Sequence, residues 1–244
     1  ILCADADLDL AAKRIVWGKF LNAGQTCVAP DYVLVPRGLR DAFVHSVGKW
    51  LRAFHGDDPR QSPDYARIIN DRHFTRLAGY LQEGRVAIGG QLDRLERFIA
   101  PTLLVDVAPD AAVMAEEIFG PILPVLAYDS LEVELARLRS GPAPLALYLF
   151  ARNHSTARRI LAEIRSGGAC INDVISHMAG CGLPFGGLGE SGMGASHGQA
   201  GFDAFSHQRT VLRRATWLDL PFRYPPAKLS VAGLKRALRI LLGD

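Results

Sequence analysis

A cysteine on a glycine-containing turn is the residue in this sequence best suited to chemistry. Residues 22–27 (NAGQTC) place Cys27 just beyond the predicted end of a helix, and Gly24 lets the backbone bend tightly. Such a turn can present both the thiol and its own backbone N–H to one bound carbonyl, as thiolate attack requires, because the developing oxyanion must meet a donor. The alternative is a buried structural cysteine, which composition alone favours, since free cysteine packs as a small apolar side chain.

The other cysteines give no sign of a metal site. Cys3, Cys170 and Cys181 lie far from Cys27 and from one another, and no two of the four form a Cys-x-x-Cys pair, so we expect no metal. Because the number of cysteines is even, counting alone does not exclude disulfide bonds. A chain of this size with 49% hydrophobic residues does not need such cross-links, so we expect a reducing, cytoplasmic location.

Composition also limits the partners. The 244 residues carry a formal net charge of +3 and their basic residues are scattered, so we expect no nucleic-acid partner. No apolar run approaches the roughly 20 residues of a membrane span, so no membrane partner is expected either. The chain begins at Ile1 without an initiator Met or the basic start of a signal peptide, and we expect it to be part of a longer protein.

Helices and short strands must position the turn that carries Cys27. Asp7 is suited to cap a helix that runs toward Phe20, and apolar side chains recur at helical spacing over 39–54 and again around 74–81. Short β-rich runs at 32–35 and 86–88 predict strands.

The second half of the sequence predicts a parallel sheet. Residues 145–150 form an unbroken apolar run, which is typical of a strand buried on both faces. Ser155 can cap the helix that follows, and residues 169–171 predict another buried strand. Strand, helix and strand in close order predict an α/β fold with right-handed crossovers.

Two further patterns are not interpreted as functional. Residues 187–192 (GLGESG) match G-x-G-x-x-G, but no predicted strand precedes them and no good helix follows, so we interpret them as a substrate-side or structural loop. His177 and His197 suggest a Cys–His pair, although either is more simply a surface or packing histidine.

The segment around Cys27 resembles the catalytic segment of class 3 aldehyde dehydrogenases, including relatives that oxidise coniferyl and long-chain aldehydes. The similarity runs through residues 22–34 (NAGQTCVAPDYVL) and covers nearly the whole chain to Pro226. Further segments match in the order found in that family: 64–70, 116–121 (EEIFGP), 142–150, 167–168, 172–174, 184–194 and 205–209.

The resemblance implies an NAD(P)-dependent oxidoreductase that converts an aldehyde to a carboxylic acid. In that family the cysteine forms a thiohemiacetal, hydride passes to NAD or NADP, and the resulting thioester is hydrolysed. The second Glu of EEIFGP contacts the ribose and the Phe packs near the nicotinamide; these positions are Glu117 and Phe119. A carboxylate accepts ribose hydroxyls and an aromatic face holds a flat ring. The alternative for Glu116 and Glu117 is a solvated helix start.

The resemblance also implies that parts of the enzyme lie upstream of Ile1. These parts are the general-base Glu, the oxyanion Asn and the dinucleotide-binding domain, so the isolated chain is expected to be inactive. We expect a catalytic domain with a parallel sheet core over 1–205. An oligomerisation strand and tail are expected over 206–244, with residues 206–213 pairing in a homodimer.

The expected substrate is an aromatic aldehyde, such as coniferyl aldehyde, or a medium to long aliphatic one. The residues expected to line its tunnel are Val174, Ile175, Ser176 and His177. Two alternative functions stay open: a cofactor-free thiol esterase, because the nucleophile and its backbone donor suffice for that reaction, and a non-catalytic fragment that only dimerises.

Overall fold

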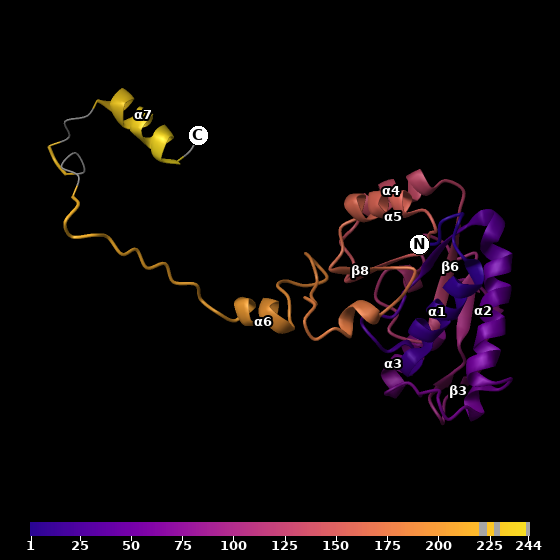
Figure 1. Cartoon of the computed structure of the whole chain (residues 1–244). Coiled ribbons are helices and arrows are strands. Elements are labelled where there is room, and N and C mark those ends of the chain that lie inside the picture. Colours follow the sequence, from indigo (N-terminus) through magenta and orange to yellow (C-terminus); the bar gives the residue numbers. More distant parts are fainter. Residues whose placement is uncertain (220–223, 227–229, 243–244) are drawn as a thin grey trace. The chain divides into compact units, whose positions relative to one another are not determined.

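A four-stranded sheet forms the centre of the fold (Figure 1). In the computed structural model its strands lie in the order β1 (Val33–Pro36), β6 (Ile122–Tyr128), β5 (Thr102–Val105) and β2 (Arg85–Ile88). Strand β6 pairs in parallel with both β1 and β5, whereas β2 runs antiparallel to β5. The mixed α/β class with parallel pairing, predicted from the sequence, is confirmed.

Helices α1 (Leu8–Phe20) and α2 (Arg40–His55) lie side by side and share the main hydrophobic core with the sheet. Asp7 caps α1 as predicted, because its carboxylate accepts the backbone N–H of Leu10 at 3.1 Å. Helix α3 (Asp71–Tyr80) and a short hairpin of β3 (Leu92–Asp93) and β4 (Phe98–Ile99) complete this part of the fold.

A second, two-stranded sheet pairs β7 (Ala146–Leu149) in parallel with β8 (Gly168–Ile171), with α5 (His154–Glu163) as the crossover. Helix α4 (Leu131–Ser140) contacts α5. Leu147 and Leu149 pack in a second core with these helices, whereas Tyr148 and Phe150 pack in the main core. The predicted burial of this strand on both faces is therefore confirmed.

Residues 1–3 join the two sheets. Leu2 donates its backbone N–H to Leu34 O at 2.9 Å, and Phe150 donates to Ile1 O at 2.9 Å. Strands β1 and β7 thus lie on either side of one short segment, and hydrogen bonding continues from one sheet to the other.

Two local predictions are wrong. Asn153, not Ser155, caps α5: its side-chain oxygen accepts the backbone N–H groups of Ser155 at 2.8 Å and Thr156 at 3.3 Å. The strand at 169–171 forms but is not buried, and Ile171 is 39% exposed. The reason is that β8 pairs only with β7 among the described residues, so its other edge is open.

The structure describes residues 1–219, 224–226 and 230–242, in two compact units, Ile1–Ser206 and His207–Asp244. The first unit ends with the short helix α6 (Gly198–Ala204), and the second contains α7 (Val231–Leu242). Residues 220–223, 227–229 and 243–244 of the predicted tail lie outside the described part. Residues 206–213 carry no strand in the described single chain, and their pairing with a second subunit stays a prediction.

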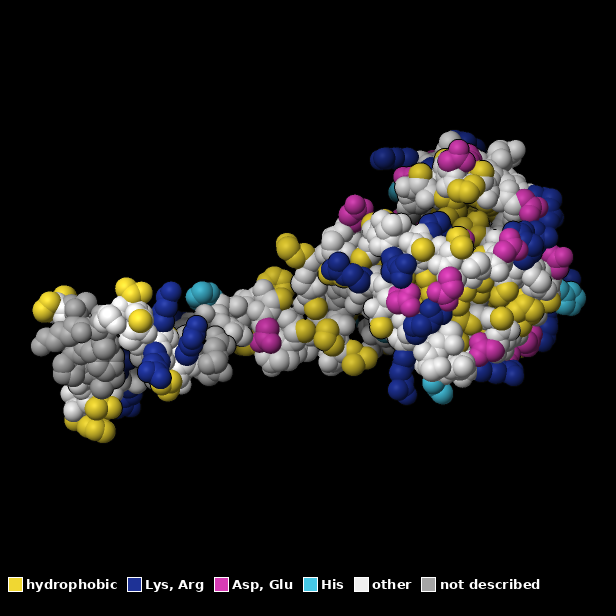
Figure 2. Space-filling model, turned by 90° about the horizontal axis from the view of Figure 1, so that it is seen from above, with side chains coloured by type: hydrophobic (Ala, Val, Ile, Leu, Met, Phe, Trp, Pro, Cys, Tyr) yellow, Lys and Arg dark blue, Asp and Glu magenta, His cyan; other side chains and the backbone are white. Residues whose placement is uncertain are grey.

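The surface mixes charges of both signs. Figure 2 shows acidic and basic side chains interspersed over the globular body, with apolar side chains between them. Among the described residues, no helix has the length and apolar character that a membrane crossing needs.

Candidate active site

The turn before Cys27 is held in a left-handed conformation. After α1 ends, Asn22 and Ala23 both have φ of 52° and Gly24 has φ of 74°. A Cβ atom on Gly24 would lie 2.2 Å from the carbonyl oxygen of Gly120. The backbone of the turn therefore packs against the backbone of the EEIFGP segment, a contact that only glycine permits. Cys27, whose thiol is exposed, comes three residues after Gly24 in the chain.

The side chain of Gln25 ties this turn to residues 67–69. Its Nε2 donates to Asn22 O at 3.0 Å and to Arg67 O at 3.1 Å, and its Oε1 accepts the backbone N–H of Ile69 at 2.9 Å. One carboxamide thus satisfies backbone groups on both segments and fixes the position of the turn.

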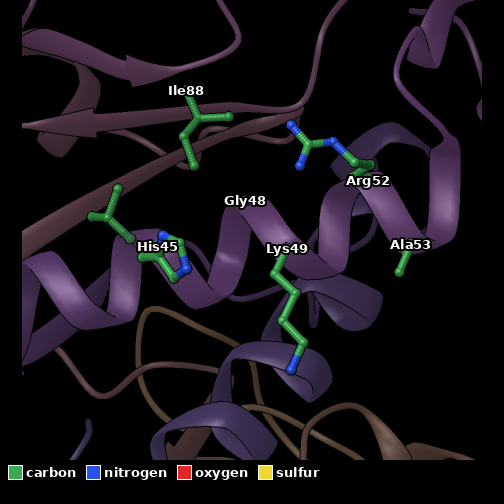
Figure 3. Close-up of a pocket in the computed structure, with 7 residues that line it drawn as sticks. His45, Gly48, Lys49, Arg52, Ala53 and Ile88 are labelled. Carbon is green, nitrogen blue, oxygen red and sulfur yellow. The ribbon is translucent and has the colours of Figure 1, made fainter.

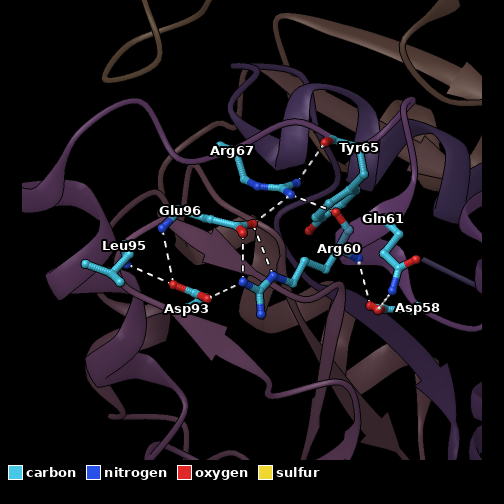
Figure 4. A network of polar contacts seen from close by, with 8 residues as sticks. All are labelled: Asp58, Arg60, Gln61, Tyr65, Arg67, Asp93, Leu95 and Glu96. Atoms are coloured by element: carbon cyan, nitrogen blue, oxygen red, sulfur yellow. Dashed lines mark hydrogen bonds and ion pairs between the residues drawn. The ribbon is translucent and has the colours of Figure 1, made fainter.

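A network of polar contacts supports the segment that Gln25 binds (Figure 4). Arg67 donates to Glu96 at 3.1 Å and to the backbone oxygen of Arg60 at 2.7 Å. Arg60 in turn contacts Glu96 at 2.7 Å and Asp93 at 2.6 Å. These contacts hold residues 60–67 against the β3–β4 hairpin.

Arg76 of α3 orders the EEIFGP segment. Its guanidinium donates to Ile118 O at 2.7 Å and to Glu117 O at 3.3 Å. Tyr80 and Arg76 both bind the carboxylate of Glu116, so this first glutamate is engaged in structure. Among the described residues, no hydrogen bond or ion pair engages the carboxylate of Glu117, which lines the cleft beside it.

A cleft of about 830 Å³ brings the predicted site residues together. Cys27, Glu117 and Phe119 all line it. Phe119 has φ of 48° and is 37% exposed, so its ring is accessible to a ligand. No acceptor among the described residues takes the backbone N–H of Cys27, which leaves that donor available to a bound carbonyl oxygen.

A buried lysine, Lys19 of α1, lines the same cleft. Desolvation lowers its pKa to about 8, against the raising effect of Asp31 and Glu117. Burial and the charge of Asp31 raise the pKa of Glu117, whereas Lys19 and Arg76 lower it. Lys19 was not among the site residues predicted from the sequence, although it follows Ile15 and Val16 on the buried face of α1, where periodicity predicts an apolar side chain.

Cys170 and His177 form a close pair without the charges of a catalytic dyad. Cys170 Sγ lies 3.4 Å from His177 Nδ1. Burial raises the pKa of the Cys170 thiol and lowers the pKa of His177, so both groups favour their neutral forms. Tyr148 packs against His177 and donates its hydroxyl to Val28 O at 2.6 Å, which anchors the residue after Cys27 to β7.

The four residues predicted to line a substrate tunnel do not line this cleft. Val174 and Ile175 are buried in the main core, and a Cβ on Gly18 would meet a methyl group of Val174 at 2.4 Å. Ser176 donates its hydroxyl to Asp173 at 2.7 Å, and His177 lies beside Cys170. None of the four lines the cleft of Cys27 in the described structure.

The G-x-G-x-x-G pattern at 187–192 forms a tight turn. A Cβ on Gly187 would lie 2.0 Å from Ser191 O. The first helix after these residues is α6, which begins at Gly198. The interpretation of these residues as a loop is confirmed.

A second cavity, of about 740 Å³, lies between α2 and β2 (Figure 3). It is lined by His45, Gly48, Lys49, Arg52 and Ile88, among others. Lys49 forms an ion pair with Asp9 at 2.9 Å, and Arg52 forms one with Asp57 at 2.8 Å. Both cations are therefore engaged in ion pairs, and among the described residues no cysteine, serine or carboxylate lines the cavity beside His45.

Fold and site together define an α/β protein with an exposed cysteine on a strained turn beside a cleft. Residues 1–211 match the model of the aldehyde dehydrogenase family, and the chain belongs to that family.

Relatives from distant organisms support this assignment. The chain is 48% identical over 225 residues to the rat "Aldehyde dehydrogenase, dimeric NADP-preferring", covering 91% of this chain and 50% of that protein. It is 46% identical over 225 residues to the 4,4'-diaponeurosporen-aldehyde dehydrogenase of Staphylococcus aureus, covering 91% and 49%. The chain thus spans about half the length of these relatives.

Solved structures agree with the fold. The substrate-bound state of Staphylococcus aureus AldH superposes with a TM-score of 0.90 at 42% identity, covering 99% of this chain and 52% of that one. The Mycobacterium tuberculosis aldehyde dehydrogenase complexed with NAD+ gives 0.78 at 30% identity, covering 89% and 46%.

Proposed function

We propose that this chain supplies the nucleophile of an aldehyde dehydrogenase. The thiolate of Cys27 adds to the carbonyl carbon of an aldehyde. The carbonyl oxygen becomes an oxyanion, which accepts a hydrogen bond from the backbone N–H of Cys27. The observation that carries the proposal is this donor, unpartnered in the described chain, next to an exposed thiol. Loss of hydride then leaves a thioester on Cys27, and water releases the carboxylic acid.

The proposed cofactor site lies in the same cleft. The carboxylate of Glu117 is suited to accept ribose hydroxyls, and the exposed ring of Phe119 is suited to pack on a nicotinamide. NAD or NADP bound there would supply the hydride acceptor. The names of the relatives above, one NADP-preferring and one solved with NAD+, support this class of cofactor.

Substrate, assembly and location are further parts of the proposal. The staphylococcal relative is named for an aldehyde substrate, which supports aldehyde oxidation, and we propose an aromatic or medium to long aliphatic aldehyde as the substrate. The rat relative is named dimeric, which supports a homodimer. A cytoplasmic location stays a prediction from cysteine usage.

A thiol esterase activity is the second candidate. Attack of Cys27 on an activated ester uses the same thiol and backbone donor and needs no hydride acceptor. Both groups lie within this chain, which favours the activity as a side reaction of the same site.

The test compares two exposed cysteines in the complete protein that carries this chain. Cys27→Ala should abolish oxidation of benzaldehyde and of a long-chain aldehyde with NAD or NADP, together with hydrolysis of a nitrophenyl ester. Cys181→Ser, the matched exposed control, should retain both. Ester hydrolysis without any aldehyde oxidation would favour the esterase, and oxidation by the Cys27 variant would refute the mechanism.

A further inference from the structure

The hydroxyl of Tyr148 is bonded to a backbone carbonyl next to the candidate nucleophile. Tyr148 lies on β7 and donates to Val28 O at 2.6 Å, and both residues are buried, with exposed fractions of 9% and 1%. In the part of the chain that the structure describes, no other hydrogen bond reaches this carbonyl oxygen. Burial raises the pKa of Tyr148 well above its ordinary value, so the hydroxyl keeps its proton and stays a donor.

Cys27 and Val28 are the two central residues of a closed turn. Ala29 donates its backbone N–H to Thr26 O at 3.0 Å, which is the bond that closes a four-residue turn. Each peptide unit of the turn is planar, and in the trans form its C=O and N–H point in opposite directions. A hydrogen bond at one end of such a unit therefore fixes the direction in which the other end points.

Two of these peptide units connect Tyr148 to the backbone N–H of Cys27. The first contains the Val28 carbonyl, which accepts the Tyr148 hydroxyl, and the N–H of Ala29. The second contains the Thr26 carbonyl, which accepts that N–H, and the N–H of Cys27. Hydrogen bonds in series polarise one another, so each bond strengthens the next donor along the series. The hydroxyl of Tyr148 thus both directs and strengthens the N–H of Cys27.

The strand and its neighbours hold the tyrosine in place. Tyr148 is opposite Cys170 in the parallel register of β7 and β8, and its ring contacts the ring of His177 edge-on at a centroid distance of 5.8 Å. The ring packs in the main core and also lines the cleft of Cys27. A donor on a packed strand holds its partner more accurately than one on a loop does.

We infer that Tyr148 is a positioning residue whose hydroxyl directs the backbone N–H of Cys27 toward the oxygen of a bound carbonyl, through the two peptide units of the turn. The inference rests on the proposed function of Cys27. In that reaction a sulfur lone pair forms the S–C bond and the π electrons of the carbonyl move to its oxygen, so no proton leaves Tyr148. The direction of the donor matters most in the transition state, when charge develops on the oxygen.

Tyr128 on β6 provides a matched control. Its hydroxyl donates to Leu2 O at 2.7 Å, and both residues are buried, with exposed fractions of 7% and 0%. Neither residue lines the cleft of Cys27 in the described structure. Tyr148→Phe and Tyr128→Phe each keep the ring and remove the donor of one buried carbonyl, so both should lower the urea midpoint by similar amounts. A difference in catalysis between the two variants then depends on where the bond lies.

The first test compares acylation with alkylation of Cys27 in the complete protein, in a Cys181→Ser background that removes the other exposed thiol. Acylation is followed as the burst of nitrophenolate from nitrophenyl acetate. In Tyr148→Phe its maximal rate should fall by roughly tenfold to a hundredfold, because removing an oxyanion donor outright costs roughly a hundredfold to a thousandfold. The half-saturating ester concentration should change little. Alkylation by iodoacetamide forms no oxyanion, so its rate should not change, and Tyr128→Phe should keep both rates.

The second test measures the turn without any substrate. Hydrogen–deuterium exchange, read by mass spectrometry, is followed on a peptide that contains residues 26–32. Without the bond from Tyr148 the turn opens more readily and the N–H of Ala29 is less protected. Exchange in this peptide should therefore be faster in Tyr148→Phe than in the wild-type protein, and unchanged in Tyr128→Phe.

Several results would overturn the inference. Wild-type acylation or unchanged exchange in Tyr148→Phe would show that the hydroxyl does not hold the donor. Equal losses of acylation and alkylation would show a displaced thiol, and a raised half-saturating concentration with an unchanged maximal rate would show a contact with substrate. Failure of the proposed function is recognised separately, as acylation that persists in Cys27→Ala, and the inference would fall with it.

Discussion

Four cysteines in one chain have four different environments, and backbone geometry distinguishes Cys27 from the rest. Cys3 is buried in the second core and Cys170 lies against His177, and burial raises the pKa of both thiols. Cys181 is exposed like Cys27 but lies on the glycine-rich segment after the second sheet. A nucleophile needs both access and a donor for the oxyanion, and the turn at 22–27 supplies the two together.

A residue-scale prediction concerns Glu117. Glu117→Gln keeps the shape but replaces a charged acceptor, and hydrogen bonds to charged groups contribute roughly 1.5–3 kcal/mol. NAD-dependent oxidation should therefore fall by roughly tenfold to a hundredfold, while hydrolysis of a nitrophenyl ester should fall much less, because acylation needs no positioned nicotinamide. Steady-state kinetics with both substrates measures the difference. Equal losses would show that Glu117 has a structural role.

At the scale of elements, the catalytic turn depends on contact between two backbones. Gly24→Ala would place a Cβ 2.2 Å from Gly120 O at a φ of 74°, and no side-chain rotation can relieve a clash with backbone. Strain of this kind costs about 1–3 kcal/mol, so we expect a lower free energy of unfolding and the loss of both activities.

Gly79→Ala is the matched control for this substitution. Gly79 is exposed on α3 and a Cβ there would meet nothing within 4 Å, so the helix should gain roughly 0.5–1 kcal/mol. Urea denaturation of both variants measures the change in the free energy of unfolding, which should fall in Gly24→Ala and rise in Gly79→Ala. An active Gly24→Ala variant of normal stability would show that the turn tolerates displacement.

The sequence predicted elements whose burial is decided locally. The run at 145–150 is apolar at every position, and β7 does contact one core with Leu147 and the other with Tyr148. The exposure of β8 was not predictable, because it depends on whether another strand covers its open edge.

Some residues of the site were predictable from the sequence and others were not. The motif around Cys27 was recognised as a continuous string. Lys19 was not recognised, because a lysine in a helix is expected to face solvent. The carboxylates whose charges raise its pKa, Asp31 and Glu117, come from distant segments. Gln25 and Arg76 were likewise missed as organisers of the turn and of the EEIFGP segment, since their partners are backbone groups that no sequence pattern identifies.

At the scale of the whole molecule, both hydrophobic cores lie within the first unit, Ile1–Ser206. Among the described residues of the second unit, 207–213 form no helix or strand and make no backbone hydrogen bond with one another, so their donors and acceptors are suited to pair with a strand of another subunit. Two truncations of the complete protein test the proposed dimer. Ending the chain at Ser206 should leave the thermal midpoint of the monomer fold nearly unchanged but abolish dimerisation, whereas ending it at Asp219 should retain the dimer.

Sedimentation velocity distinguishes these outcomes, and the pair of endpoints separates the segment at 207–213 from helix α7. A dimer that survives truncation at Ser206 would place the interface on the first unit and refute a role for the segment. A dimer lost at both endpoints would assign the contact to residues after Asp219 instead. Because unpaired backbone groups in an extended segment favour pairing but do not select a partner, only the first pattern, monomer at Ser206 and dimer at Asp219, supports pairing through 207–213.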